Sequence, residues 1–425
     1  MNLKRSFVLF VSLLFLNLLS AEGKILTIED AVRLAKENNI SVKTAENNLD
    51  SLAVQNKYSW NSVSPAAKLN GNFEDDIEND STAFSLSGAV NLSLKTNLYS
   101  EIKGAKLNYE KGLLTYSEAV RQIELSVRKK FYNLIYQKEN LVLQNRSLET
   151  SRTQYLNNEE KFKNGKISEL DAFTSRVNYE SKKPVVESAE INFQNDLASF
   201  KQLLGIPQET EIALDGSLDD FLNLKEISFG LLPKVDEPAP DVKSAEYDVE
   251  IAKNSLLNLR FSAYAPVITG SYSYGKSKKS TQDDWMTTNR LSVGVSVPLD
   301  GILPWSSSAV DIKKQKNALD TAEKVLEDAK TTVAVQTESY IRKINQAVKQ
   351  LDSLKSTEKL AEQTYKMTLA AYNYGKTDFL SLQNANDSVL SAGVNLKSQA
   401  YTLISTILDL ESVLGLEFGT LETKK

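Results

Sequence analysis

The sequence contains no cysteine and no histidine in 425 residues. Without these side chains the chain has no Cys/His zinc site, no thiol nucleophile and no Ser-His-Asp or Cys-His arrangement. Catalysis by carboxylates or lysine stays open, but the side chain that most often moves protons in enzymes is missing. The sequence therefore predicts no enzyme, no metal site and no cofactor.

Glycine and proline are also scarce, and positive charge is not in excess. There are 17 glycines and 9 prolines, which disfavours a disordered or mainly β chain. Charged residues make up 25% of the chain and the formal net charge is -5, so no basic surface argues for nucleic-acid binding. The length by itself allows two or three domains.

The N-terminus has the three parts of a secretory signal peptide. Lys4 and Arg5 supply positive charge, residues 7–19 form an apolar run, and Ser20 and Ala21 end a small-residue cleavage site. The alternative is a membrane anchor, but the run is shorter than the roughly 20 residues that span a bilayer. We expect residues 1–21 to be removed on export.

The rest of the chain repeats itself. Four features of the first half return in the second half, in the same order and at offsets of 200, 201, 210 and 210 residues. They are Val42-Lys43-Thr44-Ala45-Glu46 and Val242-Lys243-Ser244-Ala245-Glu246, Pro65 and Pro266, the glycine turns at Gly165 and Gly375, and Leu203-Leu204-Gly205 and Val413-Leu414-Gly415. This order indicates a tandem duplication. The predicted divisions are a first repeat over residues 22–205, a connector over 206–240, a second repeat over 241–415 and a tail over 416–425.

After each proline the hydrophobic period changes from helical to two. Apolar residues alternate with small or polar ones between Phe84 and Leu94, and again between Leu291 and Leu299. A weaker strand precedes each of these, at residues 67–73 and 267–274, with polar loops predicted at 74–81 and 275–288. This alternation fits a half-buried strand, and it also fits a membrane barrel with lipid outside and water inside.

Aromatic residues cluster where helix is predicted to meet strand: Tyr58, Trp60, Tyr99, Phe261, Tyr264 and Trp305. Trp and Tyr at such points are typical of the girdle at a membrane surface. The alternative is ordinary core packing at a domain junction.

Long helices follow the strands in both halves. Residues 101–163 make 63 consecutive positions without proline, which is about 95 Å of helix at about 1.5 Å per residue. In the second half, apolar positions recur at three-four spacing from Leu319 to Leu354, as in a coiled-coil seam. Each long helix is expected to turn back at its glycine, which makes two helical hairpins with matching tips.

An exported chain with two copies of helix, β-hairpin and long helical hairpin resembles the TolC family of outer-membrane efflux proteins. The opening Leu26-Thr27-Ile28-Glu29-Asp30-Ala31, the Tyr-x-x-Gly turn from Tyr372 to Gly375 and the Leu-Gly close of each half resemble that family's motifs. The resemblance implies a mainly α fold with a small β part. It implies a homotrimer with a long α-helical barrel, in which each protomer adds four strands to one twelve-stranded membrane β-barrel.

The same resemblance assigns roles to residues beside the tips. It implies a pore closed by hydrogen bonds and ion pairs, in which Asp171 and Tyr372 match an acid and a tyrosine of the closing network. A hydrogen bond from a tyrosine hydroxyl to a carboxylate is reasonable chemistry there. The acidic ring expected at the narrowest point falls on Ser381 and Asn384, which are not acids. The alternative for all these residues is a polar, solvated tip.

The predicted function is a passive exit duct in the cell outer membrane, with its helices in the periplasm, serving a tripartite efflux or type I secretion system. The resemblance implies outer-membrane lipid, a periplasmic adaptor and an inner-membrane pump of RND or ABC type as partners. Beside the tip glycines Gly165 and Gly375, we expect Leu170, Phe379 and Leu380 to be exposed docking residues for the adaptor; the alternative is that they only pack within the hairpin. The competing hypothesis is a periplasmic structural coiled-coil or scaffold protein without a pore.

Overall fold

The computed structural model describes residues 24–78, 80–222, 238–281 and 283–421. The predicted signal peptide, most of the connector and the end of the tail lie outside the described residues. Among the residues that are described, no helix is long and apolar enough to cross a bilayer.

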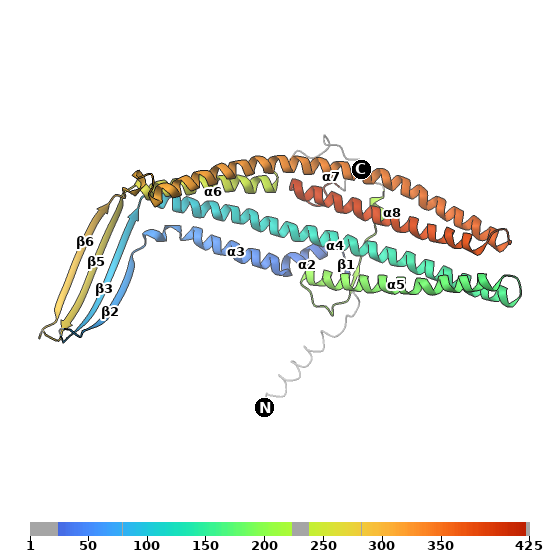
Figure 1. The fold of residues 1–425 in the computed structure, drawn as a ribbon, viewed down its shortest axis with the longest axis horizontal. Coiled ribbons are helices and arrows are strands. Elements are labelled where there is room, and N and C mark those ends of the chain that lie inside the picture. The colour runs from blue at the N-terminus through green and yellow to red at the C-terminus, as the bar shows by residue number, and fades with distance from the viewer. Residues whose placement is uncertain (1–23, 79, 223–237, 282, 422–425) are drawn as a thin grey trace, which may run out of the picture. The chain divides into compact units, whose positions relative to one another are not determined.

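Helices dominate the fold, and their order repeats (Figure 1). The first half contains α2 (Ile28–Asn38), α3 (Ile40–Lys57), α4 (Leu98–Lys163) and α5 (Glu169–Leu204). The second half contains α6 (Pro240–Tyr264), α7 (Ser307–Asn373) and α8 (Phe379–Leu414). The Thr27 side chain accepts a hydrogen bond from the Asp30 N–H and so caps the start of α2.

The strands form two sheets. A short parallel pair joins β1 (Lys24–Leu26) to β4 (Ile212–Leu214). The main sheet is antiparallel, in the order β2-β3-β5-β6, with bounds Ala66–Asp76, Ser81–Lys95, Val267–Lys279 and Met286–Ser296. The sequence predicted loops at 74–81 and 275–288, and both predictions were too long. Backbone pairing continues into these polar segments, because ladder hydrogen bonds do not require apolar side chains.

The register of the main sheet gathers its apolar side chains on one face. Directly opposed residues of an antiparallel pair share a face, as Phe73 and Phe84 do. That face, which we call the apolar sheet face, carries Leu69, Phe73, Phe84, Leu86, Val90, Leu94, Tyr272, Tyr274, Leu291, Val293 and Val295. All of them are exposed in the single chain. The opposite face carries small and polar residues such as Ser85, Ser87 and Ser292.

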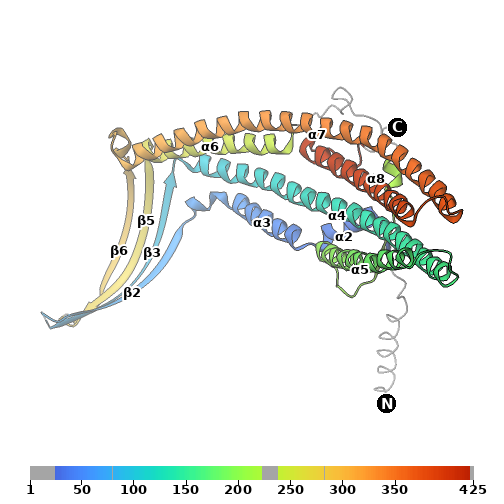
Figure 2. The same cartoon turned by 45° about the vertical axis from the view of Figure 1, so that its right-hand side comes forward.

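The chain divides into two compact units. Unit 1 comprises residues 1–43, 119–237 and 334–425, and unit 2 comprises 44–118 and 238–333, so α4 and α7 each run from one unit into the other. Within unit 1, α5 lies beside α4 and α8 lies beside α7 (Figures 1 and 2). The core of unit 1 includes Phe131, Leu134, Phe200, Ile344 and Leu403.

The predicted seam on α7 is confirmed, and its residues become more deeply buried toward the C-terminal part of the helix. Leu319, Leu326 and Val333 are half-buried, whereas Ile344 and Leu351 are almost completely buried. The increase in burial reflects the additional packing of α7 in the core of unit 1.

A buried carboxylate fixes the last turn of the chain to α8. Glu411 has no exposed surface, and its two carboxylate oxygens accept the N–H groups of Gly419 at 3.0 Å and Leu421 at 2.7 Å. The Arg121 guanidinium of α4 donates to the backbone carbonyls of Glu411 and Leu416 and lies 4.8 Å from the Phe418 ring centroid. We call this arrangement the C-terminal clamp.

Candidate functional site: the hairpin tips and the polar seam

The two hairpin tips have the same backbone. Gly165 and Gly375 adopt positive φ angles of 68° and 69°, which favour glycine. The N–H of the next residue then reaches back to the helix, from Lys166 to the Lys161 carbonyl at 2.8 Å and from Lys376 to the Ala371 carbonyl at 2.9 Å. This is the hydrogen-bonding pattern of a Schellman C-cap. The predicted pair of matching glycine turns is present in the fold.

Each tip then starts its return helix with a side-chain cap, and the two residues that form this cap are exchanged between the repeats. In the first tip, Ser168 Oγ accepts the Asp171 N–H at 3.1 Å and donates to Asp171 Oδ2 at 2.8 Å. In the second tip, Asp378 Oδ1 accepts the Ser381 N–H at 2.7 Å. A serine-aspartate pair thus becomes an aspartate-serine pair at the equivalent positions.

This exchange gives a physical reason for the serine at position 381. The acid of the second tip stands three residues earlier, at Asp378, where it caps α8. The hydroxyl and then the backbone N–H of Ser381 donate to that carboxylate and lower the pKa of Asp378. Asp378 therefore carries its negative charge at the start of α8 rather than one turn along the helix.

Tyr372 is the most firmly held residue of the second tip. Its hydroxyl donates to Asn158 Oδ1 at 2.7 Å, and its ring lies 6.0 Å from the Phe379 ring and 4.6 Å from Lys161 Nζ. Burial raises the pKa of Tyr372; the Asn158 hydrogen bond opposes that shift, and the nearby Asp171 charge adds to it. The hydroxyl therefore stays protonated at neutral pH. Within this chain the partner of Tyr372 is Asn158 rather than a carboxylate.

The three predicted docking residues do not behave alike. Leu170 and Leu380 are 75% and 58% exposed. Phe379 is only 2% exposed, so its prediction as an exposed docking residue is wrong. As the first residue of α8 it turns inward and packs on Tyr372, which the hydrophobic pattern next to the turn did not reveal.

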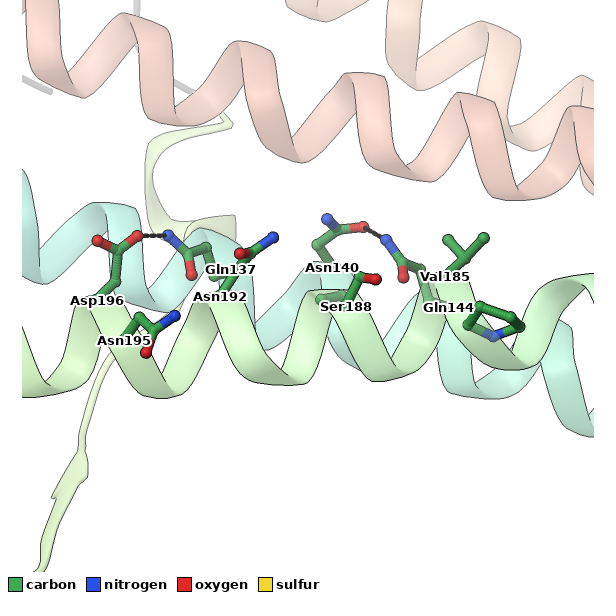
Figure 3. Close-up of a pocket in the computed structure, with 10 residues that line it drawn as sticks. Gln137, Asn140, Gln144, Val185, Ser188, Asn192, Asn195 and Asp196 are labelled. Carbon is green, nitrogen blue, oxygen red and sulfur yellow. Dashed lines mark hydrogen bonds between the residues drawn. The ribbon is translucent and has the colours of Figure 1, made fainter.

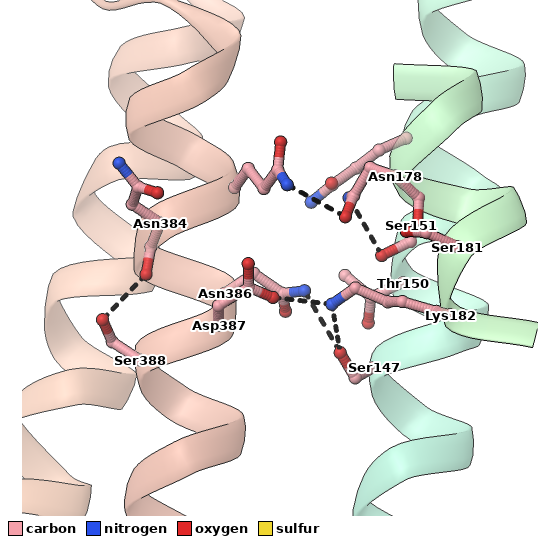
Figure 4. A network of polar contacts seen from close by, with 12 residues as sticks. Ser147, Thr150, Ser151, Asn178, Ser181, Lys182, Asn384, Asn386, Asp387 and Ser388 are labelled. Carbon is pink, nitrogen blue, oxygen red and sulfur yellow. Dashed lines mark hydrogen bonds and ion pairs between the residues drawn. The ribbon is translucent and has the colours of Figure 1, made fainter. Parts of the chain in front are cut away.

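Behind the tips, the interface between the hairpins is polar. On α4 the residues Ser147, Ser151, Gln154 and Asn158 follow one another at four-three-four spacing, and each is at most 7% exposed. Ser147 and Ser151 contact polar residues of α5 and α8, which Figure 4 shows converging, whereas Gln154 and Asn158 contact the tyrosine hydroxyls of Tyr365 and Tyr372 on α7. We call this set the polar seam: Ser147, Ser151, Gln154, Asn158, Asn178, Lys182, Gln383, Asn386 and Asp387.

The polar contacts of the seam join α5 to α4 within the first hairpin and join α5 to α8 across the two hairpins. Lys182 Nζ of α5 donates to Ser147 Oγ at 2.8 Å and pairs with Asp387 Oδ1 of α8 at 2.7 Å. Gln383 Nε2 of α8 donates to Asn178 Oδ1 of α5 at 3.1 Å. Because such bonds exchange readily with water, their net contribution is about 1 kcal/mol each. An interface of this kind can separate at a lower cost than an apolar one.

The expected ring positions lie away from this seam. Ser381 and Asn384 are exposed on α8, and Figure 4 shows Asn384 pointing away from the converging side chains. Asp387 is used in the pair with Lys182. The sequence did not identify the polar seam, although the heptad-like spacing of small polar residues on α4 was an available signal.

A second polar surface lies between α4 and α5, where Pro184 stands inside α5. This groove has a volume of about 750 Å³, and Figure 3 shows amide side chains along it. Gln137 donates to Asp196 at 2.5 Å, and Gln144 donates to Asn140 at 3.3 Å. The groove continues the polar character of the hairpin from the polar seam toward the core of unit 1. Among the described residues, no group of acidic, histidine or cysteine side chains could hold a metal ion.

Five of the six aromatic residues that the sequence places where helix meets strand are at the surface, and the sixth, Phe261, is half-buried. The exposed fractions are 46% for Tyr58, 51% for Trp60, 67% for Tyr99, 49% for Tyr264 and 77% for Trp305. These values favour the girdle over core packing, and the girdle stays a prediction.

A second aromatic group lies at the turn end of the main sheet and was missed. Phe84 and Trp285 meet edge to face, with their ring centroids 6.0 Å apart. Trp285 fell within a segment predicted as loop, so its position next to the strands could not be read from the alternation.

This architecture is similar to that of known outer-membrane proteins. Residues 231–416 match the family model described as outer membrane efflux protein. The outer membrane protein TolC of Vibrio cholerae is 20% identical over 306 residues, which are 71% of this chain and 69% of that protein.

Two solved structures extend the likeness over nearly the whole chain. The CmeC outer membrane channel of Campylobacter jejuni matches with a TM-score of 0.78 at 18% identity, over 94% of this chain and 87% of that one. The open state of the MtrE outer membrane channel of Neisseria gonorrhoeae matches with a TM-score of 0.70 at 18% identity, over 92% and 89%. At these identities the likeness establishes the fold. The mainly α architecture with a small sheet is confirmed, and with the family match so is the resemblance to the TolC family of outer-membrane efflux proteins.

Proposed function

We propose that the chain forms an exit duct in the cell outer membrane and conducts substrates passively across the periplasm and that membrane. The observation that carries the proposal is the main sheet, whose apolar face is exposed in the single chain. An apolar surface of this extent needs a cover, and a bilayer supplies one.

The strand lengths suit a membrane crossing. The four strands have 11, 15, 13 and 11 residues, and a tilted transmembrane strand needs about 9–11. Apolar positions of β3 run from Phe84 to Leu94, which is about 33 Å along the strand or about 24 Å of bilayer at a tilt of about 45°. This matches the apolar band of an outer-membrane barrel.

The sheet cannot serve as a barrel alone. Strands β2 and β6 stand at its two edges, and unpaired backbone groups are not tolerated in lipid. Four strands are too few to close, since the smallest single-chain barrels have about eight. A homotrimer that pairs β2 of one protomer with β6 of the next would satisfy both edges and make a barrel of twelve strands.

The helical hairpins would form the periplasmic part, with the tips at its far end. Leu170 and Leu380 are exposed apolar side chains close to the tip glycines, and they are the proposed docking points for a periplasmic adaptor. An adaptor with helical hairpins of its own would pack by the same knobs-into-holes geometry as a coiled coil. An inner-membrane pump of RND or ABC type would supply the energy, for efflux or for type I secretion.

The resting gate would depend on the polar seam. Asp171 and Tyr372 would belong to the closing network. Ser381 and Asn384 would line the constriction without charge, so hydrogen bonds across the seam would replace the ion pairs of an acidic gate. A duct held in this way would be weakly cation-selective and would open at modest cost.

The test is reconstitution of the full mature chain. Detergent extracts of the outer membrane should contain a trimer whose migration changes on heating, and the purified trimer should give discrete single-channel steps in a planar bilayer. A soluble periplasmic monomer that gives no conductance would instead establish the structural coiled-coil protein and overturn the duct.

A further inference from the structure

The turn end of strand β5 places positive charge on the apolar sheet face. Lys276 lies opposite Leu86 of β3 and Thr287 of β6, and Lys278 lies opposite Phe84. Since opposed residues share a face, both lysines follow Tyr272 and Tyr274 along the apolar sheet face. Lys279, in contrast, lies opposite Ala83 and belongs to the other face.

Neither Lys276 nor Lys278 forms an ion pair with any described residue. Lys276 is exposed and Lys278 is half-buried. Phe84 of β3 lies opposite Lys278, and its ring centroid is 6.0 Å from that of Trp285, the residue just before β6. The aliphatic part of a lysine can lie along such apolar surface while its ammonium group remains at the polar edge.

We propose that Lys276 and Lys278, together with Phe84 and Trp285, bind a phosphorylated lipid of the outer leaflet, with the ammonium groups at its phosphates and the aromatic rings beside its acyl chains. The inference rests on the proposed membrane insertion of the main sheet. A lipid with phosphate next to a bulky apolar body fits because charge and apolar surface adjoin on a single face.

The acidic residues of the neighbouring hairpin do not occupy this patch. Glu74 and Asp76 pair with Ala83 and Ser81 and so belong to the opposite face. Asp75 shares the apolar sheet face, but it lies on β2, two strands from β5 and about 10 Å away at the usual strand spacing. Its repulsion of a phosphate would therefore be weaker than the attraction of the two lysines.

The experiment measures lipid binding to the purified full-length mature trimer, with diphosphoryl lipid A as the probe and its dephosphorylated form as the comparison. Binding is measured by native mass spectrometry and by fluorescence of the protein's tryptophans. The variant is K276Q/K278Q, and the matched control is K68Q/K279Q, which removes two charges from the opposite face of the same sheet.

Wild type and the control should bind the phosphorylated probe at least tenfold more tightly than the dephosphorylated one. The K276Q/K278Q variant should lose about ten- to thirtyfold in affinity for the phosphorylated probe, since each lysine at an anionic lipid surface contributes about a factor of five. K276R/K278R should restore binding.

Equal affinity of wild type for the two probes would overturn the inference, and that result does not depend on any variant folding. Equal losses in K276Q/K278Q and K68Q/K279Q would overturn it as well. Single-channel conductance separates the two proposals. A trimer that conducts but shows no phosphate preference refutes only the lipid site, whereas a wild type without conductance refutes the duct.

Discussion

The two hairpin tips share a backbone but are held in different ways. At the position of Tyr372 the first tip has Phe162, which is 40% exposed and has no hydroxyl group. At the position of the buried Phe379 it has the exposed Glu169. The second tip is anchored to α4 through Asn158 and Lys161, and the first tip is not anchored in this way. The duplication therefore preserved the turn, whereas the tyrosine that contacts the other hairpin at the tip is present only in the second copy.

The anchor of the second tip should give the largest effect when it is removed. Tyr372→Phe makes the second tip resemble the first. It leaves the side-chain oxygen Oδ1 of Asn158 without its donor, and Asn158 is only 1% exposed to solvent. The free energy of unfolding should fall by about 1–3 kcal/mol, and single-channel conductance should rise. Denaturant titration and planar-bilayer recording measure the two effects.

Tyr374→Phe is the control, because Tyr374 is 80% exposed. Asp171→Ala should act in the same direction but more weakly, through the cap of the first tip. Unchanged gating in both Tyr372→Phe and Asp171→Ala would remove these residues from the gate.

A smaller effect is expected from the ion pair in the polar seam. Lys182→Gln breaks the link from α5 to Asp387 and Ser147, and it should reduce stability by about 1 kcal/mol because Asp387 can be rehydrated. Open probability should increase. Lys183→Gln is the matched control, since Lys183 pairs with Glu180 within one exposed turn. If both variants behave alike, the seam does not hold the tips closed.

The exchange of cap residues allows a test of charge position at nearly constant stability. Carboxylates restored by S381D/N384D should strengthen cation selectivity and block by multivalent cations, measured as a shift in reversal potential. The variant D378S/S381D keeps the net charge and a cap while moving the carboxylate by three residues. A shift in S381D/N384D without any in D378S/S381D would identify Asn384 as the residue at the constriction. No shift in either would show that these positions do not line it.

The smallest effect concerns pH. Folding lowers the pKa of Asp378 below the unfolded value of about 3.9. Its contribution is therefore present in full above that value and is lost as pH falls through the lowered folded pKa. The difference in urea midpoint between wild type and D378A should be constant from about pH 8 to about pH 5 and should shrink in stronger acid. A difference that grows on acidification would contradict the cap.

Much of this architecture could be predicted from periodicity. The duplication, the strands, the long helices and the two glycine turns each follow from a local pattern of spacing, φ preference or hydrophobic alternation. Such patterns depend on a few neighbouring residues, as with Thr27 at the start of α2 and Gly165 at the tip.

The contacts between the hairpins could not be predicted in this way. Phe379 looked exposed because its burial depends on Tyr372 from another helix, and Asn158 lies 214 residues from the tyrosine it binds. Lys276 and Lys278 were read as loop residues, and only the strand register placed them on the apolar sheet face. Each failure concerns a partner that is distant in sequence.

The C-terminal clamp has a consequence for the order in which the protein can fold. Unit 1 collects its residues from the beginning, the middle and the end of the chain, and the clamp joins Arg121 to residues about 290 positions later. A chain exported from its N-terminus would therefore hold an unfinished core, with apolar helix faces in need of protection, until its last residues arrive. Contacts of such high sequence separation form slowly, so the core of unit 1 is completed late in folding, when α8 and the C-terminal clamp have been added.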